Sequence, residues 1–168
     1  MSQKALIVDD SQCTGCVACE VACKQEHNVD IGARLLKVLR DGPRMVEGKV
    51  RMRYTVAHCV QCVRPSCRDA CAAGAIHKRD DGVVLIDGEL CTGCGACVQA
   101  CLFGVMAFEQ ARGMASKCDL CVARTDLGLE PACASACPSR CIHFGRVDEQ
   151  VQADAERRAL AWRKPIVR

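Results

Sequence analysis

Short apolar runs separated by turn-forming residues predict small strands along most of this chain. The strand-like runs cover residues 5–8, 75–77, 83–86, 105–108 and 142–144. The second and third of these flank Asp80-Asp81-Gly82, which is typical of a hairpin turn. Two further runs, 35–40 and 50–56, predict a ribbon joined through Asp41-Gly42-Pro43 and Glu47-Gly48. The pattern therefore favours small antiparallel hairpins over one large sheet.

The C-terminal part of the chain has a helical pattern instead. Between Asp148 and about Trp162, apolar residues recur at helical spacing and predict one buried face. The residues of that face are Val151, Ala155, Ala159 and Trp162. Residues 163–168 are basic and predict an extended, solvated tail. No apolar run is long enough to cross a bilayer, so no direct membrane span is expected.

Cysteine changes this picture, because it makes up 17 of the 168 residues. Such enrichment indicates either a disulfide scaffold or a metal protein. The chain begins without the apolar segment of a secretory signal and without a twin-arginine pair. We therefore expect a reducing, cytoplasmic location, which favours metal binding over disulfides.

Sixteen of the cysteines form four runs. The third run, from Cys91 to Cys101, has gaps of two, two and three residues. This is the spacing of bacterial four-iron ferredoxins, in which the fourth cysteine ligates the other cluster of a pair. Zinc sites usually take only two cysteines from one turn, so zinc ribbons and disulfides are the weaker alternatives. The remaining runs are Cys13, Cys16, Cys19 and Cys23; Cys59, Cys62, Cys67 and Cys71; and Cys118, Cys121, Cys133 and Cys137.

The runs are related by an internal repeat. The first and third superpose at a constant offset of 78 residues, and each contains the sequence Cys-Thr-Gly-Cys. The glycines of these sequences, Gly15 and Gly93, predict positive φ and a close backbone approach in a loop that wraps a cluster. The second and fourth runs match each other, with the third cysteine reached across a longer loop. We expect each fourth cysteine to open a short helix or to lie within one.

Charge and composition narrow the function further. The formal charge is +3, but sixteen thiolates and four [4Fe–4S]²⁺ cores would bring it to about −5, so the basic pI does not indicate nucleic-acid binding. Aromatic residues are only 3% of the chain, so bound clusters would supply much of the stabilisation. The sequence contains no nucleophile–base pair and no phosphate-binding glycine loop, and each cluster would have four cysteine ligands. This pattern predicts electron transfer rather than catalysis.

The cysteine runs and their flanking residues resemble a known family. The residues that carry the resemblance are Cys13 to Glu26, Lys117-Cys118-Asp119-Leu120-Cys121, Gly128 to Cys133, Cys137-Pro138 and Phe144-Gly145. The chain is similar to the four-cluster, ferredoxin-type electron-transfer subunits of molybdenum and tungsten pterin oxidoreductases of the dimethyl-sulfoxide-reductase kind. Related subunits serve formate dehydrogenases, hydrogenases, carbon monoxide dehydrogenases and tungsten aldehyde oxidoreductases.

The resemblance implies four [4Fe–4S] clusters with ligands exchanged between runs. The implied sets are Cys13, Cys16, Cys19 and Cys137 for cluster 1; Cys59, Cys62, Cys67 and Cys101 for cluster 2; Cys91, Cys94, Cys97 and Cys71 for cluster 3; and Cys118, Cys121, Cys133 and Cys23 for cluster 4. It also implies an α+β fold of two bicluster modules, with little regular secondary structure. Residues 58–105 would form an inner module, inserted into an outer module of residues 1–57 and 106–168.

Several residues depart from the pattern or lie outside it. The proline that follows the last cysteine of a run is kept at Pro138, whereas Ala72 and Leu102 stand at the equivalent positions. Cys141 aligns with Ala75 in the repeat, so we expect a buried small side chain rather than a reactive thiol. We expect the four histidines, His27, His58, His77 and His143, to be ordinary packing or surface residues rather than ligands.

The resemblance and the ligand count together predict an electron-relay subunit that is not itself catalytic. The expected partner is a catalytic redox subunit, with a tungsten or molybdenum pterin enzyme favoured. A flavin, NAD, ferredoxin or quinone-linked subunit would be the second carrier, and self-stacking into a homo-oligomer is open. The alternatives are a free polyferredoxin, an accessory protein of metalloenzyme maturation, and a structural or regulatory cluster protein. A nucleic-acid partner is not expected.

Overall fold

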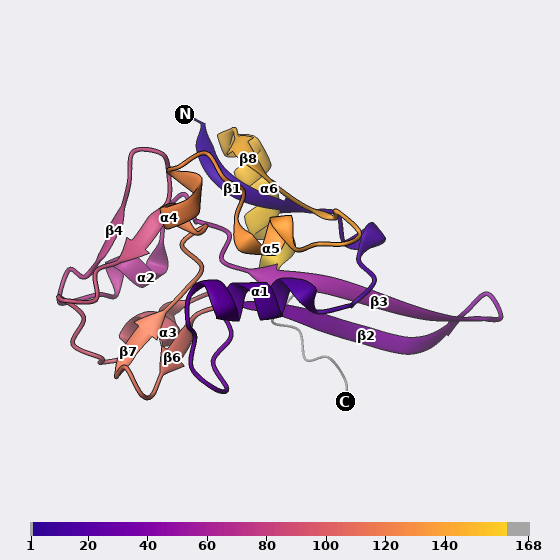
Figure 1. Ribbon diagram of the computed structural model, residues 1–168, viewed down its shortest axis with the longest axis horizontal. Helices are drawn as coiled ribbons and strands as arrows, with labels where there is room; N and C mark the ends of the chain where they lie inside the picture. Colours follow the sequence, from indigo (N-terminus) through magenta and orange to yellow (C-terminus); the bar gives the residue numbers. More distant parts are fainter. Residues whose placement is uncertain (1, 161–168) are drawn as a thin grey trace.

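The computed structural model describes residues 2–160, in which short strands and helices are linked by the cysteine loops (Figure 1). The elements are β1 (Gln3–Val8), η1 (Asp10–Gln12), α1 (Ala18–Glu26), β2 (Leu36–Val46), β3 (Lys49–His58), α2 (Ser66–Asp69), β4 (Ile76–Lys78), β5 (Val84–Ile86), α3 (Ala96–Ala100), β6 (Ala107–Glu109), β7 (Met114–Ser116), α4 (Val122–Thr125), α5 (Ala132–Ser135), β8 (Ile142–Val147) and α6 (Glu149–Ala159). Small antiparallel hairpins with few short helices agree with the predicted α+β class.

The strands form four separate two-stranded antiparallel sheets: β1–β8, β2–β3, β4–β5 and β6–β7. Strand β1 pairs with β8 from Gln3 opposite Val147 to Val8 opposite Ile142, so the first strand lies beside the last one. The predicted strands at 5–8, 75–77, 83–86 and 142–144 are all present. The predicted strand at 105–108 begins later, at Ala107 of β6, and the buried Val105 and Met106 precede it. Its partner strand β7 was not predicted.

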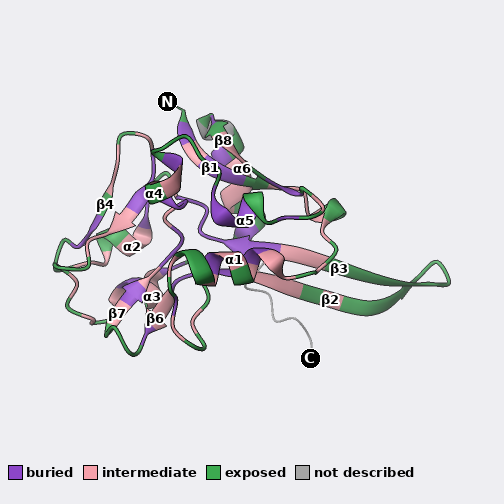
Figure 2. Ribbon diagram, viewed as in Figure 1, coloured by how far each residue is buried: buried purple, intermediate pink, exposed green. Residues whose placement is uncertain are grey.

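The predicted ribbon is formed by β2 and β3 and is longer than expected. Its turn is at Glu47 and Gly48, which both have positive φ, as in the tight turns that suit twisted hairpins. The Asp41-Gly42-Pro43 segment is not a second turn but lies at a register shift within β2. The ribbon is buried at its root and exposed toward its tip, which projects from the rest of the molecule (Figure 2).

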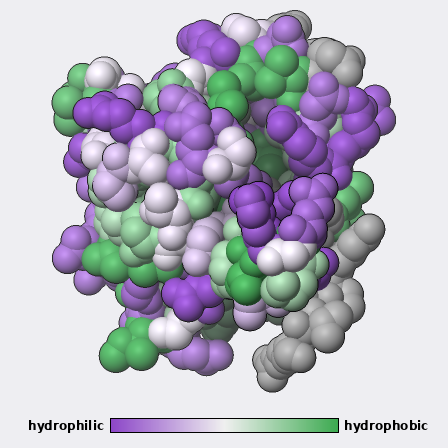
Figure 3. All heavy atoms as spheres, turned by 90° about the vertical axis from the view of Figure 1, so that its right-hand side faces the viewer, coloured by the Kyte–Doolittle hydropathy of each residue, from purple (hydrophilic) through white to green (hydrophobic). Residues whose placement is uncertain are grey.

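Apolar side chains lie exposed on the outer half of this ribbon, at Met45, Val46, Val50 and Met52. The face of the molecule toward which the ribbon points mixes apolar and polar side chains (Figure 3).

Helix α6 follows β8 and begins at Asp148, whose side chain accepts a hydrogen bond from the Val151 N–H at 2.8 Å. The predicted apolar face is only partly correct. Ala159 is buried, but Val151 is 40% exposed, whereas Gln152 is buried and donates to the Val60 carbonyl. The helix therefore packs partly through Gln152, because the chain beneath it presents a backbone carbonyl. Trp162 and the predicted tail 163–168 lie outside the described residues.

The core is built from aliphatic side chains and cysteines together. Leu36, Val56, Val83 and Val84 are nearly fully buried, and they cluster with the thiols of several cysteine runs. Among the described helices, none combines the length and the apolar character that a membrane crossing requires.

Candidate metal centres

The four Cys-x-x-Cys loops share one backbone feature, because the residue before the second cysteine always has a positive φ. These residues are Gly15 (+70°), Gln61 (+52°), Gly93 (+70°) and Leu120 (+60°). A left-handed residue in such a loop turns successive N–H groups to one side, which makes a concave site for an anion. The two glycines were predicted to adopt this conformation, but Gln61 and Leu120 carried no sequence signal for it.

Space explains why glycine occupies this position in the first and third loops. A Cβ atom at residue 15 would overlap the Tyr54 ring, and one at residue 93 would overlap the Gly113 carbonyl oxygen. The β6–β7 hairpin, whose turn contains Gly113, therefore lies directly against the third cysteine loop.

In the second and fourth loops the corresponding side chains are part of the core. Gln61 and Leu120 are both 0% exposed. The Gln61 amide donates to the Cys118 carbonyl (2.9 Å) and accepts from the Val84 N–H (2.9 Å), so it ties the second loop to the fourth loop and to β5. Burial of these side chains offsets the cost of their left-handed backbone, which is about 1–2 kcal/mol per residue.

All seventeen cysteines fall within the described residues, and none of them forms a disulfide. The thiols gather where segments distant in sequence meet. Cys19 on α1 lies near Cys13 of its own loop and near Cys137, which follows α5. Cys133 on α5 lies near Cys121 and near Cys23 on α1. Helices α1 and α5 pack together, and this packing brings the ends of the first and fourth runs into contact.

The middle runs meet in the same way. Cys62 lies near Cys59, Cys67 and Cys101, which belong to the second and third runs. Helices α2 and α3 carry Cys67 and Cys97, and they pack together. The fourth cysteines of these runs follow the helices, as does Cys137 after α5, so the prediction that a fourth cysteine opens a helix or lies within one is correct only for Cys23. Cys97 on α3 in turn lies near Cys91 and Cys71.

Electrostatic interactions between cysteines of different groups indicate the order of the groups. Cys19 lies within electrostatic range of Cys133, which connects the group of the first loop with that of the fourth. Cys118 lies near Cys59, which connects the fourth loop with the second. The two exposed cysteines, Cys16 and Cys94, belong to the first and third loops, at opposite ends of this order.

Burial makes these thiols poor anions without a counter-charge. It raises the pKa of Cys19, Cys23 and Cys133 to about 12, and the negative charge of neighbouring thiolates adds to the effect. A bound metal would supply the missing positive charge and hold the sulfurs deprotonated. Lys117 brings a further buried cation, which donates to the Cys118 carbonyl (2.8 Å) and favours the Cys67 thiolate. Grouped, buried thiols in loops lined by N–H groups fit iron–sulfur clusters.

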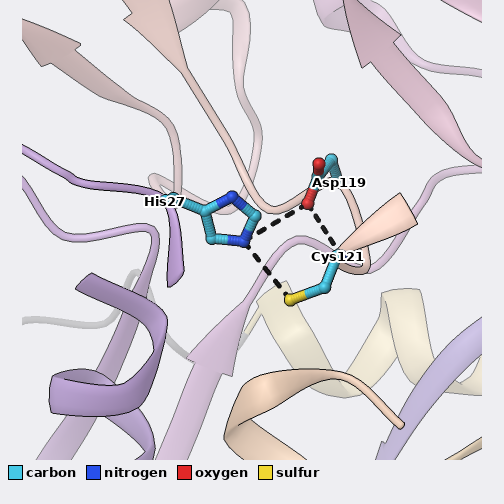
Figure 4. Close-up of side chains that lie close together, drawn as sticks. All are labelled: His27, Asp119 and Cys121. Carbon is cyan, nitrogen blue, oxygen red and sulfur yellow. Dashed lines mark hydrogen bonds and ion pairs between the residues drawn. The ribbon is translucent and has the colours of Figure 1, made fainter. Parts of the chain in front are cut away.

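One histidine contacts a cysteine of these groups. The His27 Nε2 atom lies 3.3 Å from the Cys121 sulfur and 3.5 Å from an Asp119 carboxylate oxygen (Figure 4). Sequence reasoning treated His27 as an ordinary side chain and missed this contact. A signal was available, because His27 follows Cys23 by four residues and therefore projects from the same side of the chain.

The structure also places Cys141 and the other three histidines. Cys141 is 2% exposed, and its sulfur lies 3.6 Å from that of Cys137. His58 is buried, and burial lowers its pKa, so its ring packs as a neutral group against the Val56 carbonyl (2.9 Å). His77 and His143 are exposed on β4 and β8.

Comparison with known proteins also indicates iron–sulfur clusters. Residues 50–147 match the family model of the 4Fe-4S dicluster domain. The sequence is 33% identical to a component of the anaerobic dimethyl sulfoxide reductase of Escherichia coli, over 95% of this protein and 82% of that one. It is also 33% identical to the iron–sulfur subunit of the nitrate-inducible formate dehydrogenase of Escherichia coli, over 93% of this protein and 58% of that one. A putative iron–sulfur subunit of a dimethyl sulfoxide reductase of Halobacterium salinarum is 32% identical, over 89% of this protein and 68% of that one.

Proposed function

The chain belongs to the family of iron–sulfur electron-transfer subunits that contain the 4Fe-4S dicluster domain, and from this premise we propose that it holds four [4Fe–4S] clusters in a row and relays single electrons along them. It is a subunit of an oxidoreductase complex and not the catalytic subunit itself. Each bound cluster supplies one-electron chemistry, and the residues of this chain hold the clusters, exclude water from them and set their spacing.

The proposed ligand sets are those that the family resemblance implies. The proximity of the thiols supports two of these sets. Cys19 has Cys13 and Cys137 as neighbours, and Cys133 has Cys121 and Cys23. The neighbours of Cys62 and Cys97 support the other two sets. The sets are Cys13, Cys16, Cys19 and Cys137 (cluster 1); Cys59, Cys62, Cys67 and Cys101 (cluster 2); Cys91, Cys94, Cys97 and Cys71 (cluster 3); and Cys118, Cys121, Cys133 and Cys23 (cluster 4).

We further propose that clusters 2 and 3 form an inner module, residues 58–105, inserted into an outer module of residues 1–57 and 106–168. Pairing of β1 with β8 supports the outer module, because it joins the two sequence segments assigned to that module. Elements α2, α3 and β4 lie together on the opposite side of the molecule from the ribbon (Figure 1). The β6–β7 hairpin lies against the third cysteine loop, so it would cover the inner module although it follows residue 105.

The order of the thiol groups is the observation that carries the relay proposal. The groups follow one another as 1, 4, 2 and 3, with the exposed Cys16 at one end and the exposed Cys94 at the other. Cys118, in the middle, is buried. Electrons would therefore enter near one exposed loop and leave near the other, while the inner clusters are shielded from solvent.

For the partner, we propose a catalytic subunit that contains a molybdenum or tungsten pterin cofactor. The relatives support a catalytic redox partner, since they are named as parts of dimethyl sulfoxide reductases and a formate dehydrogenase. The projecting ribbon offers exposed apolar side chains on which such a subunit could pack, including Met45 and Val50. The second carrier, self-stacking and a cytoplasmic location remain predictions. A free polyferredoxin or maturation factor is the alternative, and it predicts no stable partner.

Anaerobic purification of the untagged protein from its native host tests the proposal. We expect molybdenum or tungsten to co-elute with the protein on a sizing column in constant ratio to its iron. We also expect magnetic interaction between clusters in the electron paramagnetic resonance spectrum of the fully reduced protein, because adjacent clusters would lie close together. Full iron loading without a larger partner would support the polyferredoxin instead. Four magnetically isolated clusters would contradict the proposed row.

A further inference from the structure

We propose that His27 sets the reduction potential of cluster 4 by donating a hydrogen bond to the Cys121 sulfur, with Asp119 holding the imidazole in place. This inference rests on the proposed assignment of Cys121 and Cys23 to one cluster. His27 would act through the ligand sulfur and not as a ligand itself. It is therefore a positioning residue for the relay.

The backbone fixes where the ring lies. His27 ends α1, and its N–H donates to the Cys23 carbonyl (3.2 Å), so its position is tied to the neighbouring ligand of the same cluster. Its carbonyl in turn accepts a hydrogen bond from the Arg112 guanidinium (3.4 Å). Figure 4 shows the ring directed toward the Cys121 sulfur and the Asp119 carboxylate. The ring is only partly exposed, so water competes weakly for its Nε2 atom.

Asp119 connects the ring and the loop. One of its oxygens accepts from the Cys121 N–H at 2.8 Å and also lies 3.5 Å from His27 Nε2. Because a carboxylate and a thiolate are both acceptors, the ring nitrogen that faces them carries the proton. The proton can then be shared between the Asp119 oxygen and the Cys121 sulfur, which is the nearer of the two at 3.3 Å.

The internal repeat supplies a natural comparison. In the repeat, Cys23 corresponds to Cys101, and the residue that corresponds to His27 is Val105. Asp119 corresponds to Val60, and Cys121 to Cys62. Both valines are buried, so cluster 2 has aliphatic side chains where cluster 4 has a donor and a carboxylate. The fold is therefore built without the polar pair at one of the two equivalent sites.

A hydrogen bond to a ligand sulfur withdraws electron density and stabilises the more negative, reduced state of a cluster. We expect loss of the His27 donor to weaken reduction of cluster 4 about tenfold, which corresponds to a downward shift of about 59 mV for a one-electron couple. The other three potentials should not move.

The test is a redox titration of the complete protein, followed by electron paramagnetic resonance, with the valine of the repeat placed at residue 27. We expect His27→Val to lower the reduction potential of one cluster by about 59 mV, a tenfold change in its reduction equilibrium, and to leave the iron content unchanged. His27→Gln keeps an N–H donor and should restore most of the shift. His77→Val is the matched control, because His77 lines the same groove from β4 but is exposed, and it should leave all four potentials unchanged. Unchanged potentials in fully loaded His27→Val would overturn the proposal.

Two further measurements keep the outcomes distinct. Pulsed resonance on the unmodified reduced protein should show a weak nitrogen coupling and an exchangeable proton at one cluster. A strong coupling would identify His27 as an iron ligand, and the absence of coupling would show that the hydrogen bond is not formed. Either result would overturn the proposal. Cys121→Ser should alter the signal of the same cluster. If it alters a cluster that His27→Val leaves unchanged, or none, the ligand assignment has failed rather than the role of the histidine.

Discussion

Replacing Gln61 by leucine should loosen the junction between the second and fourth cysteine loops. The fourth loop already carries Leu120 at the equivalent left-handed position, so the backbone accepts leucine there. The change removes two side-chain hydrogen bonds. The Val84 N–H is left buried without its acceptor, whereas the Cys118 carbonyl keeps the hydrogen bond from Lys117. An unsatisfied buried group costs about 1–3 kcal/mol and a lost hydrogen bond costs about 0.5–1.5 kcal/mol, so the native state should lose about 1.5–4.5 kcal/mol. The free energy of unfolding of an ordinary domain is only about 5–15 kcal/mol, so this loss is a large part of it.

Cluster release measures this loss, because unfolding of a cluster protein is irreversible and its stability is a rate. The iron–sulfur absorbance is followed anaerobically after addition of guanidinium. If the lower figure of about 1.5 kcal/mol falls on the unfolding barrier, release should be about 12-fold faster in Gln61→Leu. Gln99→Leu is the control, since Gln99 is an exposed glutamine of α3, and its rate should equal that of the unmodified protein. An acceleration of less than about threefold in Gln61→Leu would refute the reasoning.

Three other predictions follow from the site and its surroundings. Gly93→Ala should lower the iron bound per chain more than Gly95→Ala, because both residues have positive φ but only residue 93 faces a backbone oxygen; equal iron contents would contradict this. Asp126→Asn should speed cluster release at neutral pH. Hydrogen bonds from Arg79 hold the pKa of Asp126 below its ordinary value. The ionised carboxylate therefore stabilises the folded protein fully at pH values above the ordinary pKa, and this stabilisation is lost as the pH falls through the lowered pKa. The ratio of the two release rates should therefore approach one in acid, and a ratio that grows there would exclude this account. Removal of iron by an anaerobic chelator should unfold the cysteine loops, seen as loss of amide-exchange protection near Leu120; full protection without iron would show that the thiols need no metal.

Much of the local structure was predictable because it depends on short-range chemistry. The hairpin at Asp80-Asp81-Gly82 and the ribbon root near Leu36 follow from turn residues and apolar runs, and both are present. Positive φ in the first and third loops was predictable from glycine. In the second loop, Gln61 adopts the same conformation, because burial and two hydrogen bonds offset its strain, and no property of glutamine indicates this.

Long-range structure was less accessible. Strand β7 was missed because Met114-Ala115-Ser116 is too short and too weakly patterned to predict a strand. The grouping of thiols from different runs depends on helix packing between α1 and α5, and here only the family resemblance anticipated it. The contact of His27 with Cys121 was also missed, although a comparison of His27 with its repeat partner Val105 would have singled it out.

The most direct test of the relay is to count iron and electrons in the same sample. The protein is purified anaerobically, its iron and sulfide are determined per chain, and it is titrated with a strong one-electron reductant. The account predicts about sixteen irons, about sixteen sulfides and about four electrons per chain. About eight irons and two electrons, or zinc in place of iron, would contradict it.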